Sequence, residues 1–175
     1  FYVDSADQLA APYIDGRPPR PMQEPDVSPF FELSGIRYSP ARATRPASFP
    51  SGGAGMVGTA GDVLKLLEAI RTGGGPVLSQ ASAASMLSNQ IGELTVTTHG
   101  PGWGFGYAGA VLKDPAAAGS PLRQGTVSWG GVYGHSWQIV PDRETTVVAL
   151  TNTAIEGMSG VFPGELGAAV AQAVG

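Results

Sequence analysis

Apolar residues recur at helical spacing in one segment of the first half of the chain. Thr59 stands where an N-cap is expected, Asp62 follows three positions later, and glycines at 73–75 end the segment. The apolar positions of the repeat are Val63, Leu64, Leu66, Leu67 and Ile70. This pattern predicts a helix over residues 60–71. A shorter apolar repeat predicts a second helix within residues 79–90.

From about residue 102 the pattern becomes that of strands. Four runs rich in Val, Tyr, Trp, Thr and Ile follow one another: GWGFGYAGAVL, GTVSWGGVY, HSWQIVP and TTVVALTN. We expect four consecutive antiparallel strands. TTVVALTN has hardly any polar interruption, so it is predicted to be a central strand buried on both faces. Ala and Val at helical spacing in PGELGAAVAQAVG predict a final helix that lies on the sheet.

The first fifty residues follow neither pattern, because they hold nine of the fifteen prolines. A proline inside a helix costs about 3 kcal/mol, so a long surface excursion is predicted here. A disordered linker is the alternative, but the segment carries more large apolar groups than a solvated linker normally does. These are Phe1, Tyr2, Leu9, Tyr13, Phe30, Phe31, Leu33, Ile36 and Tyr38.

Together these elements predict an α+β fold in which an antiparallel sheet is flanked by helices. The length of 175 residues suits one domain with a real core. We divide it into a Pro-rich excursion (1–50), a helical part (51–100), and a part with the sheet strands and the final helix (101–175).

The composition limits the kinds of partner and cofactor that the protein is expected to bind. The net charge is −4 with only 10 Lys and Arg, so the basic surface that binds nucleic acid is missing. No apolar run approaches the roughly 20 residues of a membrane span, and a soluble protein is expected, in the cytoplasm or in the periplasm or secreted. The sequence has no Cys, and His99 and His135 lie far apart without a metal-binding motif, so neither a metal nor a cofactor is expected.

Neither Ser136 nor Ser51 fits a nucleophile motif. Ser136 does not fit a G-x-S-x-G elbow, because Gln138 stands where the second glycine is needed and a strand follows instead of a helix. Ser51 lies in the glycine-rich PSGGAG, but the lysine of a phosphate-binding loop does not follow it. A structural turn is the favoured interpretation of that segment.

Trp129, Gly130 and Gly131 raise a different question, because glycine inside a strand costs about 0.5 to 1 kcal/mol relative to alanine. A β-bulge or a tight bend would explain the two glycines. Bare backbone that meets a substrate beside the Trp129 ring would also explain them. The residues alone leave both interpretations open.

Three segments together resemble a known superfamily. SGGAGMVGTAGDVLKLL, GWGFGYAG and WGGVYGHSWQIVPDRETTVVALTN, in this order, resemble the C-terminal half of the serine β-lactamases and penicillin-binding proteins, and most of all the family VIII carboxylesterases. FYVDSADQLAAPYIDG resembles the segment that follows their helical subdomain. The resemblance covers nearly the whole chain and implies the C-terminal portion of a β-lactamase/transpeptidase-like fold.

The resemblance also implies an activity, which is acyl transfer through a serine ester. The serine and its lysine come from an S-x-x-K motif, and a tyrosine assists them. Trp129-Gly130-Gly131 matches the esterase form of the third motif, the counterpart of Lys-Thr-Gly, and a backbone N–H at Gly131 or Val132 would belong to the oxyanion hole. The side chains that the resemblance places near the substrate are Tyr133, His135 and Trp137.

The chain departs from the family in one essential respect. Neither Lys65 nor Lys113 has a serine three positions before it, and no Tyr-x-Asn occurs. We therefore expect the nucleophile and its base in a segment upstream of Phe1, which would be the partner of this chain, with a small ester as substrate. Processing into two chains, nicking, or the choice of the expressed segment would each produce such a piece.

Other functions stay open at this point. The chain could be a catalytically inactive binding module that kept the fold. A β-lactamase or a D-peptidase is a further alternative, but it is less favoured because Trp129 stands where a lysine commonly engages a substrate carboxylate.

Overall fold

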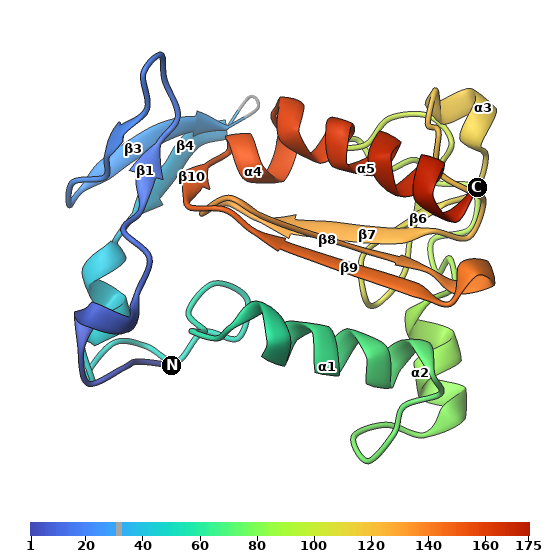
Figure 1. Ribbon diagram of the computed structural model, residues 1–175, viewed down its shortest axis with the longest axis horizontal. Coiled ribbons are helices and arrows are strands. Elements are labelled where there is room, and N and C mark those ends of the chain that lie inside the picture. Colours follow the sequence, from blue (N-terminus) through green and yellow to red (C-terminus); the bar gives the residue numbers. More distant parts are fainter. Residues whose placement is uncertain (31–32) are drawn as a thin grey trace.

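The central element of the fold is a five-stranded antiparallel sheet. A computed structural model describes residues 1–30 and 33–175, and Figure 1 shows the sheet with helices on both faces. Its strands, in spatial order, are β5 (Trp103–Phe105), β6 (Ala110–Leu112), β7 (Val127–Gly131), β8 (His135–Val140) and β9 (Thr145–Leu150). This arrangement confirms the predicted α+β fold with an antiparallel sheet flanked by helices.

Both predicted helices of the first half begin at their predicted caps. α1 (Ala60–Arg71) starts after Thr59, whose hydroxyl accepts the N–H of Asp62 at 3.2 Å. α2 (Gln80–Met86) starts after Ser79, which accepts the N–H of Ser82 at 3.1 Å, and it ends four residues before position 90. These caps satisfy orphan N–H groups of the first turn, which is why the sequence alone locates the helix starts.

The helices cover opposite faces of the sheet. α1 lies on one face, while α4 (Glu156–Ser159) and α5 (Val161–Val174) lie on the other (Figure 1). A short helix, α3 (Pro115–Ala118), and a 3₁₀ turn, η3 (Pro141–Arg143), connect strands. The buried cluster between α1 and the sheet consists of Leu67, Ile70, Val111, Val127 and Ile139.

Two predictions about the strands were wrong. GWGFGYAGAVL is not one strand but a hairpin, in which β5 and β6 pair across a turn whose Gly106 N–H donates to the Gly109 carbonyl at 2.8 Å. TTVVALTN is not central, because β9 pairs only with β8 in the described part of the chain, and none of its residues is fully buried. An apolar run shows that both faces of a strand meet other groups, but it does not reveal what lies along its edge.

The Pro-rich segment is folded in the described ranges. Two 3₁₀ turns, η1 (Ala6–Gln8) and η2 (Pro40–Thr44), accompany two small sheets. In one sheet, β1 (Tyr13–Ile14) lies between β2 (Arg20–Pro21) and β10 (Thr153–Ala154), and it pairs with β10 in parallel. The other is the hairpin of β3 (Asp26–Phe30) and β4 (Leu33–Tyr38).

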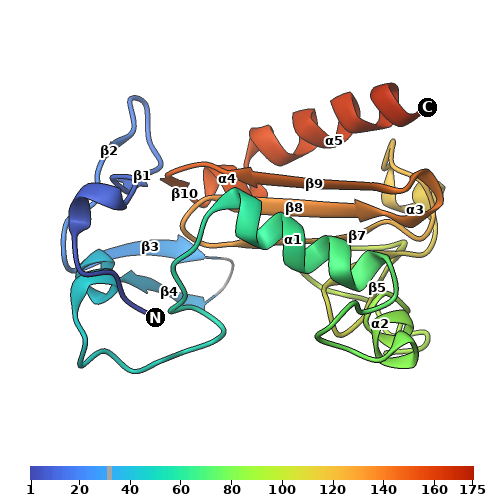
Figure 2. The same cartoon turned by 60° about the horizontal axis from the view of Figure 1, so that its bottom comes forward.

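This segment is therefore not a disordered linker, and it stands at one end of the main sheet (Figures 1 and 2). Tyr38 shows how it packs, because its side chain is fully buried. Phe31, one of the apolar residues of this segment, lies outside the described residues. Within the described ranges, the helices are too short or too polar to cross a membrane.

Candidate functional site

The Trp129-Gly130-Gly131 motif forms the end of β7. It pairs residue by residue with β8, Trp129 opposite Trp137, Gly130 opposite Ser136 and Gly131 opposite His135. The register does not shift along this ladder, so the two glycines do not mark a β-bulge. The motif is thus regular β-strand up to Gly131, and a tight turn follows it directly.

Close packing explains why position 130 is a glycine, and the sequence did not reveal this. A Cβ at this position would lie 2.6 Å from the Met158 Cγ of α4 and 2.6 Å from the His135 carbonyl oxygen. At Gly131 the nearest atom to such a Cβ would be the Nδ1 of His135, at 3.2 Å. Gly130 therefore lets α4 approach the sheet, whereas the space beside Gly131 is limited only by a histidine ring.

The Trp129 ring belongs to an aromatic cluster. The His99 ring stacks on it with a centroid distance of 5.3 Å and an interplanar angle of 11°, and Phe105 meets it edge-on at 5.0 Å. Trp103 contacts the other side of the cluster, 5.2 Å from His99. The Trp129 side chain is still 37% exposed, so part of its ring faces solvent.

His99 was missed as a site residue by sequence reasoning. It comes from the loop before β5, and nothing in its local pattern points to β7. The Thr98 hydroxyl lies 3.0 Å from its Nδ1 and orients the ring. Burial lowers the pKa of His99 below its usual value, so the imidazole is neutral at pH 7 and acts as an uncharged ring against the indole.

The turn that joins β7 to β8 carries Val132, the candidate oxyanion donor. The Gly134 N–H donates to the Gly131 carbonyl at 2.9 Å and closes the turn, and Gly134 adopts a φ of +105° that suits glycine. The Val132 carbonyl accepts two hydrogen bonds, from the Ile155 N–H at 3.1 Å and from the Tyr38 hydroxyl at 3.2 Å. Among the described residues, the Val132 N–H finds no acceptor.

The three side chains that were expected near a substrate have different surroundings. His135 is half-buried beside Gly131, and burial lowers its pKa. The Tyr133 hydroxyl accepts the Ser39 N–H at 3.0 Å, and its ring meets the Tyr38 ring edge-on. Trp137 packs against the core cluster below α1. Of the three, only His135 lies directly beside the motif glycines.

Ser136 lies opposite Gly130 in the ladder and points to the face of the sheet that α4 covers, away from the face of Trp129 and Trp137. It is only 5% exposed, and its hydroxyl has no hydrogen-bond partner among the described residues. No group of three or more His, Asp or Glu side chains in the described ranges is arranged to hold a metal ion.

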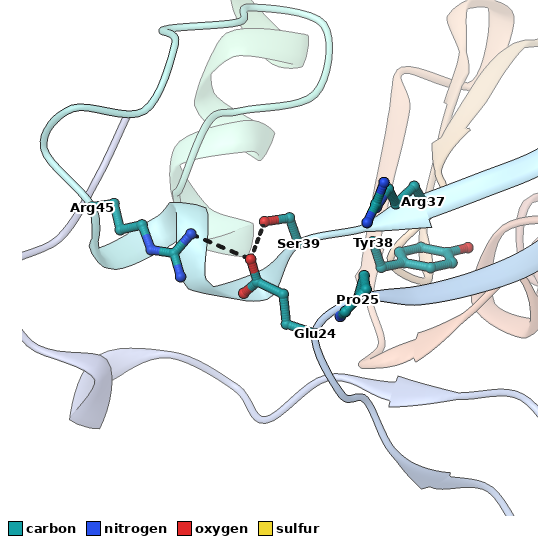
Figure 3. A pocket seen from close by; sticks show the side chains of 6 residues that line it. All are labelled: Glu24, Pro25, Arg37, Tyr38, Ser39 and Arg45. Atoms are coloured by element: carbon teal, nitrogen blue, oxygen red, sulfur yellow. Dashed lines mark hydrogen bonds and ion pairs between the residues drawn. The ribbon is translucent and has the colours of Figure 1, made fainter.

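A separate pocket lies where the Pro-rich segment enters η2, and Glu24, Pro25, Arg37, Tyr38, Ser39 and Arg45 line it (Figure 3). The Glu24 carboxylate accepts hydrogen bonds from the Ser39 hydroxyl at 2.7 Å and the Ala41 N–H at 3.1 Å, and Arg45 lies 3.3 Å away. These donors, the Ser39 hydroxyl first, lower the pKa of Glu24. The carboxylate thus joins the strand before η2 to the turn itself.

Comparisons with known proteins agree with one another. Residues 3–172 match the Beta-lactamase family. The chain is 50% identical over 163 residues to the esterase EstB of Burkholderia gladioli, an alignment that covers 91% of this chain and 41% of that protein. The solved structure of EstCE1, described as a hydrolase with promiscuous acyltransferase activity, superposes with a TM-score of 0.90 at 46% identity, over 98% of this chain and 45% of EstCE1. The chain thus spans less than half the length of these relatives.

Proposed function

The chain belongs to the Beta-lactamase family, and from this premise we propose that it is the sheet-side, C-terminal portion of a serine esterase that cleaves carboxylic esters. The observation that carries the proposal is the 50% identity, over 91% of this chain, to a protein named as an esterase. The shared fold alone would not specify the chemistry.

In the proposed reaction, the nucleophile comes from a segment upstream of this sequence, which carries Ser-x-x-Lys and a tyrosine. As the serine oxygen attacks the ester carbonyl carbon, its proton passes to the lysine and tyrosine pair, and the carbonyl electrons move onto the carbonyl oxygen to form an oxyanion. When the carbonyl re-forms, the alcohol leaves with a proton from the lysine and tyrosine pair. Water then attacks the acyl-serine in the same way and releases the acid.

In this proposal the chain contributes a hydrogen-bond donor for the oxyanion and an aromatic ring beside the substrate. The Val132 N–H, which has no acceptor among the described residues, is the donor proposed for the oxyanion. A donor of this kind contributes about 3 to 4 kcal/mol to transition-state stabilisation. Trp129 places a neutral ring at the position where the β-lactamases have a lysine. Neutral esters are therefore the proposed substrates rather than substrates with a carboxylate.

The upstream segment is also the proposed partner of the sheet. β9 has a strand on one side only in the described part of the chain, and an open edge pairs readily with a further strand. Pairing along β9 would join the nucleophile segment to the strands that carry Trp129.

A fluorophosphonate probe tests the proposal in the full-length protein that contains this segment. We expect one labelled serine upstream of Phe1, and ester turnover that falls with labelling. Trp129→Ala combined with Gly131→Val should reduce turnover, whereas Tyr107→Ala, which changes a side chain that is 71% exposed, is the control and should not. Labelling of a serine within residues 1–175, or unlabelled protein without turnover, would contradict the proposal; the second result would favour an inactive binding module.

A further inference from the structure

We propose that Tyr38 is a positioning residue for the oxyanion donor, and that it acts through the Val132 carbonyl. This role rests on the proposed function, because it presumes that the Val132 N–H faces the developing charge. The two residues lie 94 positions apart in sequence and meet only through the fold.

Tyr38 is well placed to hold this carbonyl. Its side chain is fully buried, and its hydroxyl donates to the Val132 oxygen at 3.2 Å. The Tyr133 ring packs edge-on against it at 5.1 Å, which fixes the direction of the phenol. Burial and then the neighbouring Tyr133 raise the pKa of Tyr38 to about 12, so its hydroxyl stays protonated and keeps donating at any pH used for ester hydrolysis.

A second donor restrains the same oxygen from another segment. The Ile155 N–H donates to the Val132 carbonyl at 3.1 Å from the residue before α4. Ile155 has a φ of +67°, a value that a β-branched residue adopts only when its surroundings impose it. Two donors from segments far apart in sequence therefore converge on one carbonyl.

Tyr38 is itself anchored by its neighbours in the Pro-rich segment. The Ser39 N–H donates to the Tyr133 hydroxyl at 3.0 Å, while the Ser39 hydroxyl donates to Glu24 at 2.7 Å. Figure 3 shows Glu24 holding Ser39 beside Tyr38. The Pro-rich excursion thus does more than cover surface, because it supports the turn after the Trp-Gly-Gly motif.

The carbonyl and the N–H of Val132 belong to the two peptide planes that meet at its Cα. The N–H plane also contains the Gly131 carbonyl, which the Gly134 N–H holds at 2.9 Å, and the Tyr38 and Ile155 donors hold the carbonyl plane of Val132. Neither plane can therefore rotate about the Val132 Cα without breaking a hydrogen bond. A donor fixed in advance stabilises the oxyanion without reorganising during the reaction. Loss of the Tyr38 hydroxyl should therefore affect the transition state more than the bound substrate.

The test is Tyr38→Phe in the full-length protein with a 4-nitrophenyl ester. Deleting an oxyanion donor outright lowers kcat by about 100-fold or more, so loosening one is expected to lower kcat by about 10-fold, with KM changed less than about 2-fold. The turnover of an ester relative to its thionoester should fall as well, because sulfur is a poor acceptor and gains little from the donor. A purely structural defect would not change this ratio.

Thr151→Val is the matched control. It removes a hydroxyl that donates to the Gly134 carbonyl at 2.5 Å, in the same turn but not at Val132. This variant should lose thermal stability to a similar extent and keep the ester-to-thionoester ratio of the wild type. Glu24→Gln, which weakens the anchor of Ser39, should lower the ratio slightly and provides a second variant if Tyr38→Phe does not fold.

The outcomes separate this inference from the proposed function. If the wild type turns over esters and Tyr38→Phe, or Glu24→Gln in its place, keeps the wild-type ratio, the role of Tyr38 is wrong and the esterase proposal stands. If the wild type neither turns over esters nor reacts with the fluorophosphonate, both are wrong. A lowered ratio in Tyr38→Phe with an unchanged ratio in Thr151→Val supports the inference.

Discussion

The turn after β7 and the edge of β9 belong to the same sheet, but this chain completes them to different extents. At the turn, the Val132 carbonyl has two donors, and Gly130 allows α4 to pack closely. Along β9, the described residues supply a strand on one side only. The turn after the Trp-Gly-Gly motif is therefore held by segments of this chain, whereas β9 keeps one unpaired edge among the described residues.

The apolar side chains near β9 are also only partly covered by the described residues. Figure 2 shows α1 in front of the sheet and α5 above it. On α1, Leu67 and Ile70 are buried, but Leu66 is 51% exposed and Leu64 39% exposed. Leu150 at the end of β9 is 40% exposed. Apolar groups next to an open strand edge favour association with a further segment.

The largest effect is expected when residues 1–175 are produced alone. The β9 amides should exchange about a thousandfold faster than those of β7 and β8, and the chain should self-associate. Addition of the upstream segment should protect β9 and give a single species. Hydrogen exchange with mass spectrometry and size-exclusion chromatography measure both effects. If residues 1–175 alone are a monomer with a fully protected β9, then β9 does not need the upstream segment.

Gly130→Ala tests the packing below the turn. The new Cβ would overlap Met158 and the His135 carbonyl, so a loss of about 1 to 3 kcal/mol in unfolding free energy is expected. Gly131→Ala is the matched control, because its Cβ meets only a histidine ring atom at 3.2 Å and should cost less. Urea unfolding of the full-length protein measures both. Equal losses would mean that α4 does not depend on Gly130.

Glu68→Gln tests how α1 holds β9. Glu68 accepts a hydrogen bond from Thr146 of β9 and pairs with Arg71 at 2.8 Å. Hydrogen bonds from Arg71 and then Thr146 lower the pKa of Glu68 to about 2. We expect a loss of about 1 kcal/mol at neutral pH, since Glu68 is partly exposed and its ion pair is screened.

The pH dependence of this loss has a definite sign. In the unfolded chain Glu68 binds its proton near pH 4.5, while in the folded protein it does so only near pH 2. The stabilisation is therefore complete above about pH 4.5 and disappears as the pH falls toward 2. Unfolding curves of wild type and Glu68→Gln should converge over this range. A difference that stays constant down to pH 2 would show that the charge of Glu68 is not involved.

The smallest effect is expected in the aromatic cluster around Trp129. His99→Ala removes the ring stacked on Trp129, and an aromatic pair contributes about 0.5 to 1.5 kcal/mol, so KM for neutral esters should rise by about 3- to 10-fold with little change in kcat. His99→Phe keeps a ring and should restore most of the affinity. Steady-state kinetics of the full-length protein decide this. If His99→Phe is as impaired as His99→Ala, the imidazole nitrogens matter rather than the stack.

The local features of the fold could be predicted because their causes are local. Thr59 and Ser79 cap helices whose first N–H groups lie three residues away, and glycines end α1. The hairpin of β5 and β6 was missed because its turn contains only small residues and one tyrosine, which read as a continuous strand. The resemblance located the Trp-Gly-Gly motif, but not the atoms around it.

The sequence by itself determined the helices, the order of the strands and the motif at the end of β7, because short-range capping and apolar periodicity are written in neighbouring residues. Only the tertiary structure decided that β9 lies at an edge, that His99 stacks on Trp129 and that Tyr38 reaches Val132. Each of these depends on segments that meet across many residues, and no periodicity encodes which distant partner a side chain will find. The free energy of such contacts comes from burial and from hydrogen bonds that exist only once the sheet has formed.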